Sequence, residues 1–110
     1  EFSKKLKAIG IDLIDCSSGG LVSNAKIPVE PNYQVPFAEA IRREAKIATA
    51  AVGMITEPQQ AEAILKAGQA DAIMVARQFL REPYMAFRAA QELGASVDVP
   101  RQYGRAIDLR

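Results

Sequence analysis

Residues 71–84, DAIMVARQFLREPY, decide the fold predicted for this chain. The apolar run at residues 72–75 is typical of a strand buried on both faces, and Pro83 suits the first turn of a following helix. Ala76 and Arg77 stand where the strand ends, so a small residue lets backbone N–H groups approach an anion and a guanidinium can bind phosphate. Two interpretations stay open: an anion site, or an arginine that pairs with a helix carboxylate.

Two more strand–helix units precede this stretch. Apolar runs predict strands at residues 11–15 and 47–52. One helix is predicted to open at Pro36, and another to follow Thr56, which with Gln59 has the spacing of a capping box. Three such units in a row predict an α/β fold with parallel strands and right-handed crossovers. Ligand groups are then expected at the carboxyl ends of the strands.

Apolar spacing also assigns the inner face of each helix. The predicted inward positions are Phe2, Leu6 and Ile9 in a helix over residues 1–9, Phe37, Ile41 and Ala45 in the second helix, and Ala61, Ile64 and Leu65 in the third. Arg42 is expected to face solvent. Because the first helix begins at residue 1 with an apolar face, we expect the chain to be cut from something longer.

Small residues follow the first two predicted strands. Residues 16–20, CSSGG, form either a ligand loop or a plain turn. Gly53 either lets the backbone approach a ligand closely or serves a tight turn. Cys16 is interpreted as a small buried residue rather than a nucleophile, since the chain has no histidine to activate it. The irregular, proline-containing segment 21–36 is expected to be a functional loop.

Composition sets further bounds on function. The chain has 110 residues, enough for one domain, and its 49% apolar content supports a core. A net charge of +1 gives no electrostatic case for binding nucleic acid or a membrane surface. The single cysteine fits a reducing, cytoplasmic location, and the absence of histidine removes the commonest metal ligand, so no metal site is predicted. No signal peptide or membrane-spanning run is recognised.

Several motifs, taken together, resemble the old yellow enzyme family. They are SSGG at 17–20, YQVPFA at 33–38, the AVG-x-I-T turn at 51–56 and R-x-x-L-R-x-P-Y at 77–84. The match is best to the bacterial NADPH dehydrogenases and ene-reductases, and it covers nearly the whole chain up to residue 105. The resemblance implies the last three βα units of a (β/α)8 TIM barrel over residues 1–94, followed by a tail over 95–110.

The resemblance also implies a function. It predicts hydride transfer from NADPH or NADH through FMN to an activated alkene of the enone type. Gly53, Ala76 and Arg77 are assigned to the FMN phosphate, whereas the catalytic residues lie upstream, so the isolated chain is expected to be inactive. The tail is expected to reach a neighbouring subunit of a homo-oligomer, a dimer or a tetramer, and to place Arg105 in its active site.

Two other hypotheses are kept open. The first is a fragment of another phosphate-binding (β/α) barrel enzyme, such as an aldolase or an isomerase. The second is a non-catalytic truncation that folds by self-association, because a three-stranded parallel sheet has two open edges.

Overall fold

The structure is a computed structural model that describes residues 1–107 of the chain. The contacts between residues divide it into two compact units, Glu1–Val75 and the part that starts at Ala76, and each is described by itself. The elements in chain order are α1 (Phe2–Ala8), β1 (Leu13–Cys16), α2 (Val35–Ala45), β2 (Ala48–Val52), α3 (Pro58–Lys66), β3 (Ala72–Met74), α4 (Arg77–Arg81), α5 (Met85–Leu93) and α6 (Arg101–Ile107).

The first unit is built on one parallel sheet with strand order β1-β2-β3. Cys16 of β1 lies opposite Ala51 of β2, which in turn lies opposite Ile73 of β3. A parallel pair needs a crossover connection, and here α2 and α3 provide the two crossovers. The predicted α/β fold with three parallel strands is therefore confirmed, with each strand one residue shorter than expected.

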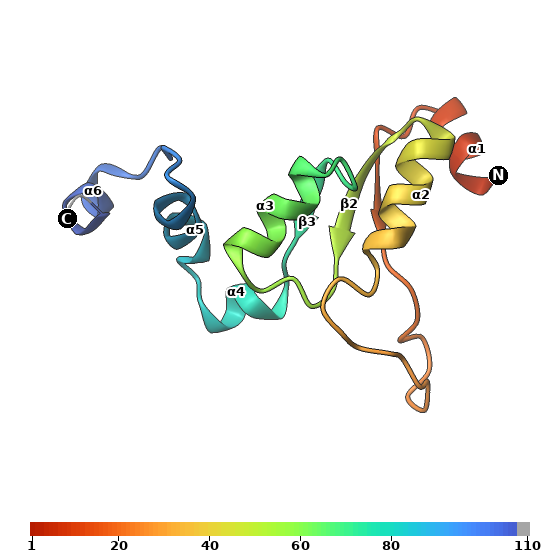
Figure 1. Ribbon diagram of the computed structural model, residues 1–110, viewed down its shortest axis with the longest axis horizontal. Coiled ribbons are helices and arrows are strands. Elements are labelled where there is room, and N and C mark those ends of the chain that lie inside the picture. The colour runs from red at the N-terminus through yellow and green to blue at the C-terminus, as the bar shows by residue number, and fades with distance from the viewer. Residues whose placement is uncertain (108–110) are drawn as a thin grey trace. The chain divides into compact units, whose positions relative to one another are not determined.

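One face of this sheet carries the core. Figure 1 shows α2 beside β1 and β2, and α3 beside β3. The buried cluster joins both helices to the strands; its members are Cys16, Val35, Ala38, Ala51, Ile55, Ile64 and Ala70. Side chains alternate between faces along a strand, so Leu13 and Met74 point to the other face. They are 42% and 46% exposed on the two edge strands, whereas Ala50, on the same face of the central strand, is fully buried.

The predicted inner faces of the helices are partly wrong. Ala38 of α2 is fully buried, whereas Phe37 is 47% exposed. The alanine-rich strand β2 lets α2 approach closely, and the Thr49 hydroxyl donates to the Ala38 carbonyl at 3.2 Å, so the small residue faces the sheet. Leu65 of α3 is likewise exposed, and α1 buries none of its residues.

Two predicted helix starts are also wrong. The N-cap of α3 is Glu57 and not Thr56, and the side chain that accepts the Thr56 N–H at 3.1 Å is Gln60. Pro83 does not open a helix. It lies in a turn between α4 and α5, where the Met85 N–H donates to the Glu82 carbonyl at 3.1 Å. The short helix α4 occupies residues that the sequence pattern had left without a helix.

The second unit contains α4, α5 and α6. Arg88 of α5 forms ion pairs with Glu82, at 2.5 Å, and with Glu92, at 2.6 Å, and the bond from Arg88 holds the pKa of Glu82 below its usual value. The helix α6 forms in a segment where no apolar period predicted one, and the Tyr103 N–H donates to the Pro100 carbonyl in its first turn. Residues 108–110 of the expected tail lie outside the described residues.

Candidate functional site

The carboxyl end of the sheet is held together by one buried amide side chain. Gln34, 3% exposed, precedes α2 and lies between the ends of β1 and β2. Its Oε1 accepts the Ser18 N–H and, at 3.2 Å, the Ser18 hydroxyl, while its Nε2 donates to the Val52 carbonyl at 2.9 Å. Gln34 thus fixes the loop after β1 to the end of β2, and residues 17–20 remain exposed around it.

Gly53 follows β2 at the same end, with a φ of +101°. A Cβ built there would lie 2.7 Å from Gln34 Nε2 and 2.7 Å from Tyr33 Cε1. Such separations are too short for real Cβ atoms, so both the backbone angle and the packing require glycine. The space that a side chain would need is filled by Tyr33 and Gln34, which gives Gly53 a structural role whether or not a ligand approaches its backbone.

Cys16 ends β1 and is buried, at 4% exposed, as the sequence predicted. Burial, followed by the nearby Asp15 carboxylate, raises the pKa of its thiol. A raised pKa keeps the thiol protonated near neutral pH, and a thiol is a poor nucleophile compared with a thiolate. Cys16 therefore belongs to the core and not to a reactive site.

Ala76 and Arg77 open the second unit, at the start of α4. Both are exposed. Within residues 1–107, the Arg77 guanidinium forms no hydrogen bond or ion pair, whereas Arg81 of the same helix bonds to Gln78 at 2.9 Å. The alternative in which Arg77 pairs with a helix carboxylate is therefore not observed. The N–H donors of the Arg77 guanidinium are available to a ligand.

Arg105 lies in α6 and is exposed. Two residues before it, Tyr103 contacts the rings of Tyr84 and Phe87 near the start of α5. The structure therefore brings the residues expected at the carboxyl ends of β1 and β2 together through Gln34. Ala76, Arg77 and Arg105 belong to the second unit.

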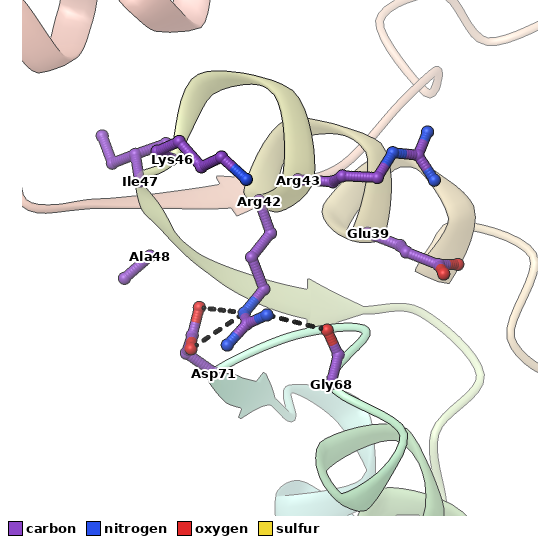
Figure 2. A pocket seen from close by; sticks show the side chains of 8 residues that line it. All are labelled: Glu39, Arg42, Arg43, Lys46, Ile47, Ala48, Gly68 and Asp71. Carbon is purple, nitrogen blue, oxygen red and sulfur yellow. Dashed lines mark hydrogen bonds and ion pairs between the residues drawn. The ribbon is translucent and has the colours of Figure 1, made fainter.

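A polar cluster that the sequence pattern did not predict lies at the opposite, amino-terminal end of the sheet. Arg42, expected to face solvent, donates from Nε to both Asp71 carboxylate oxygens at 3.0 Å and from Nη1 to the Gly68 carbonyl at 3.1 Å. Figure 2 shows the Arg42 side chain reaching from α2 toward Asp71 and Gly68, while Arg43 points away from them.

Asp71 also accepts the Thr49 N–H at 3.0 Å. This backbone bond, assisted by Arg42, holds the pKa of Asp71 below its usual value. A cavity of about 530 Å³ lies beside the cluster. The groups of this cluster form hydrogen bonds with one another across α2, β2 and the start of β3. We therefore interpret the cluster as a structural clamp. The one sign of this clamp in the sequence is the opposite charge of Arg42 and Asp71, which are 29 positions apart.

Neither a metal site nor a membrane span is found in the described part of the chain. No group of three or more Cys, Asp or Glu residues there is arranged to hold a metal ion. No helix among the described residues is long and apolar enough to cross a membrane.

Comparison with known proteins identifies the family. Curated relatives include three proteins named NADPH dehydrogenase. The one from Geobacillus sp. (strain WCH70) is 56% identical over 104 residues, the one from Halalkalibacterium halodurans 60% over 104, and the one from Listeria innocua 54% over 105. These alignments cover 94–96% of this chain but only 30–31% of each relative, so the chain spans about a third of their length. Residues 1–95 match the model of a single family, and the chain therefore belongs to the NADH:flavin oxidoreductase / NADH oxidase family.

Proposed function

We propose that this chain is part of an FMN-dependent oxidoreductase that uses NADPH or NADH to reduce an activated alkene. The observation that carries the proposal is the family match over residues 1–95, supported by relatives named NADPH dehydrogenase. When bound, FMN would supply the hydride-transfer chemistry, and the protein would bind and orient it. The same match argues against an aldolase or isomerase.

The parallel sheet supports a place in a barrel. Three strand–helix units would be three of the eight units of a (β/α)8 barrel, which we take to be the last three. Leu13 and Met74, on the face opposite the buried cluster, would then point into the barrel interior. The loops at the carboxyl ends of the strands would form part of its ligand-binding rim.

We propose that Gly53, Ala76 and Arg77 bind the phosphate group of FMN. The fit of this chain to a phosphate rests on Arg77, whose exposed guanidinium has five N–H donors and no partner within residues 1–107. The small Ala76 side chain leaves the neighbouring backbone accessible. Gly53 would contribute through its backbone, since Tyr33 and Gln34 occupy its side-chain position.

The test compares two arginines in the assembled enzyme. We expect Arg77→Ala to weaken FMN binding by at least about tenfold, because a charge-assisted hydrogen bond is worth roughly 1.5–3 kcal/mol. Arg42→Ala is the control, since Arg42 is engaged by Asp71 at the other end of the sheet and should leave FMN affinity unchanged. Titration of the apoenzymes with FMN, followed by flavin fluorescence, gives both constants. Equal affinities for the two variants would contradict the site.

Residues 95–110 form the second part of the proposal. We propose that this tail reaches a neighbouring subunit of a homo-oligomer and that Arg105 binds substrate in that subunit's site. The exposed position of Arg105 in α6 supports the proposal, as does the permanent charge of a guanidinium, which suits it to bind a polarised carbonyl.

Mixed oligomers test this role of Arg105. One subunit type carries Arg105→Ala and the other carries a change upstream that prevents flavin binding, so each flavin-competent site of a mixed dimer faces a normal tail. In dimers of Arg105→Ala alone, every site faces a mutant tail. If Arg105 acts in trans, the mixed dimer keeps the wild-type KM for the alkene while the Arg105→Ala dimer shows a raised KM. An equally raised KM in both would place Arg105 in its own subunit's site.

A further inference from the structure

Three aromatic rings connect α6 to the start of α5. The Tyr103 ring centroid lies 5.8 Å from that of Tyr84 and 6.2 Å from that of Phe87, with the ring planes tilted by 51° and 50°. Tyr84 and Phe87 are themselves stacked at 6.2 Å. These separations lie in the range of favourable aromatic pairs. The neighbouring Tyr103 hydroxyl also raises the pKa of Tyr84.

The helix α6 has little else to stabilise it. It has seven residues, a length at which an isolated helix is marginal in water. Gly104 in its middle is a poor helix former, and Arg101 and Arg105 place like charges four residues apart on one face. Its stability must therefore come from packing.

The described side chains of α6 that lie toward α5 share one face of the helix. Tyr103 and Ala106, three residues apart, line a cavity of about 420 Å³ together with Phe87 and Gln91 of α5. At 3.6 residues per turn, Arg105 lies about 200° around the helix from Tyr103. When Tyr103 packs on α5, Arg105 is therefore directed away from it, and so is Arg101; both arginines are exposed.

We propose that Tyr103 is a positioning residue: its contact with Tyr84 and Phe87 holds α6 in place and thereby fixes the point from which Arg105 projects. This inference rests on the proposed role of Arg105 for its functional consequence, but the anchoring of α6 stands on the contacts alone. The three rings hold α6 in place, and Arg105 projects from the helix that they hold. Removal of the Tyr103 ring should therefore change the position of Arg105 while its guanidinium stays intact.

Limited proteolysis with trypsin tests the anchor directly in the assembled enzyme. Trypsin cleaves after arginine, and mass spectrometry separates cleavage after Arg101 and Arg105 from cleavage elsewhere. We expect Tyr103→Leu to speed cleavage after these two arginines by about tenfold, because cleavage tracks local opening. Tyr103→Phe keeps the ring and should stay much closer to wild type.

Gly104→Ala provides a change of opposite sign. A Cβ at Gly104 meets nothing within 4 Å, so alanine should strengthen α6 and slow cleavage. Cleavage after Lys66 of α3 is the internal control for global unfolding and should be equal in all variants. Wild-type cleavage rates after Arg101 and Arg105 in Tyr103→Leu would overturn the anchor.

Kinetics test the positioning. We expect Tyr103→Leu to raise the KM for the alkene, as Arg105→Ala does. The double variant should have the same KM as Arg105→Ala alone. Tyr103→Phe, which keeps the ring, should have the wild-type KM. A loosened tail with unchanged KM in Tyr103→Leu, where Arg105→Ala raises KM, would overturn the positioning role. An unchanged KM in Arg105→Ala would instead overturn the proposed function of Arg105, while proteolysis still decides the anchor.

Discussion

The two ends of the parallel sheet are held together by different means. At the amino-terminal end, the charged pair Arg42 and Asp71 joins α2 to the start of β3 and reaches Thr49 in β2. At the carboxyl end, the neutral amide of Gln34 joins the loop after β1 to the end of β2. The charged clamp is half-exposed, whereas the amide is buried. An arginine beside this sheet therefore need not mark a ligand site, because Arg42 is bound by Asp71 and Gly68 of the protein itself.

Buried and tightly packed contacts should cost more to break than half-exposed ones. The first prediction therefore concerns the carboxyl end. We expect Gly53→Ala to lower the free energy of unfolding by about 3 kcal/mol, because the new methyl group would overlap Tyr33 and Gln34 and the backbone has a positive φ. Urea unfolding of the purified protein, followed by circular dichroism, measures the change.

Gly20→Ala is the matched control for Gly53→Ala. Gly20 also has a positive φ, +76°, but a Cβ there meets nothing within 4 Å. It should cost only the backbone strain, about 1 kcal/mol. If the two variants were equally stable, the overlap with Tyr33 and Gln34 would contribute nothing, and the carboxyl end would be no more tightly packed than an open loop.

The second prediction concerns the clamp at the amino-terminal end. We expect Asp71→Asn to lower the free energy of unfolding by about 1 kcal/mol at pH 7, a value reduced by the solvent exposure of the pair. The folded-state pKa of Asp71 lies below its unfolded value. Its contribution is therefore present above the unfolded pKa of about 3.9 and is lost as the pH falls through the folded pKa.

Urea unfolding at several pH values tests this sign. The stability difference between wild type and Asp71→Asn should shrink steadily below about pH 4. Arg43→Ala is the control, since within residues 1–107 Arg43 pairs with Glu44 alone, at 3.5 Å, and both side chains are about two-thirds exposed. It should have almost no effect at any pH. A difference that persisted unchanged at pH 2 would mean that Asp71 acts through packing and not through its charge.

Local patterns were enough to predict the strands but not the details of the helices. The apolar runs located all three strands to within one or two residues, because a buried parallel strand needs consecutive apolar side chains. The start of α3 was missed by one residue, since Gln60, not Gln59, reaches the Thr56 N–H. The predicted helix start at Pro83 was wrong because two short helices, α4 and α5, follow β3, and Pro83 lies between them.

The candidate site was predicted in part. The small residues at the ends of β1 and β2 were recognised, yet Gln34, which connects them, was not, although it lies inside the YQVPFA run that signalled the family. A glutamine before a helix carries no local sign that it is 3% exposed. The contact of Tyr103 with Tyr84 was missed for the same reason, since 19 residues separate them in the chain.

Local features of the chain were enough to identify the family, the parallel α/β class and the alternation of the three strands with α2 and α3, since these follow from periodicity, from turn residues and from motifs that are local in the chain. Which polar side chains stabilise the fold, and which remain available to a ligand, depends instead on tertiary contacts. The sequence pattern predicts that Arg42 faces solvent and that Arg77 lies at a strand end, and neither prediction names a partner residue. Arg42 meets Asp71 across the sheet, while Arg77 has no partner within residues 1–107. A side chain's partner depends on residues distant in the chain, and only folding brings those together.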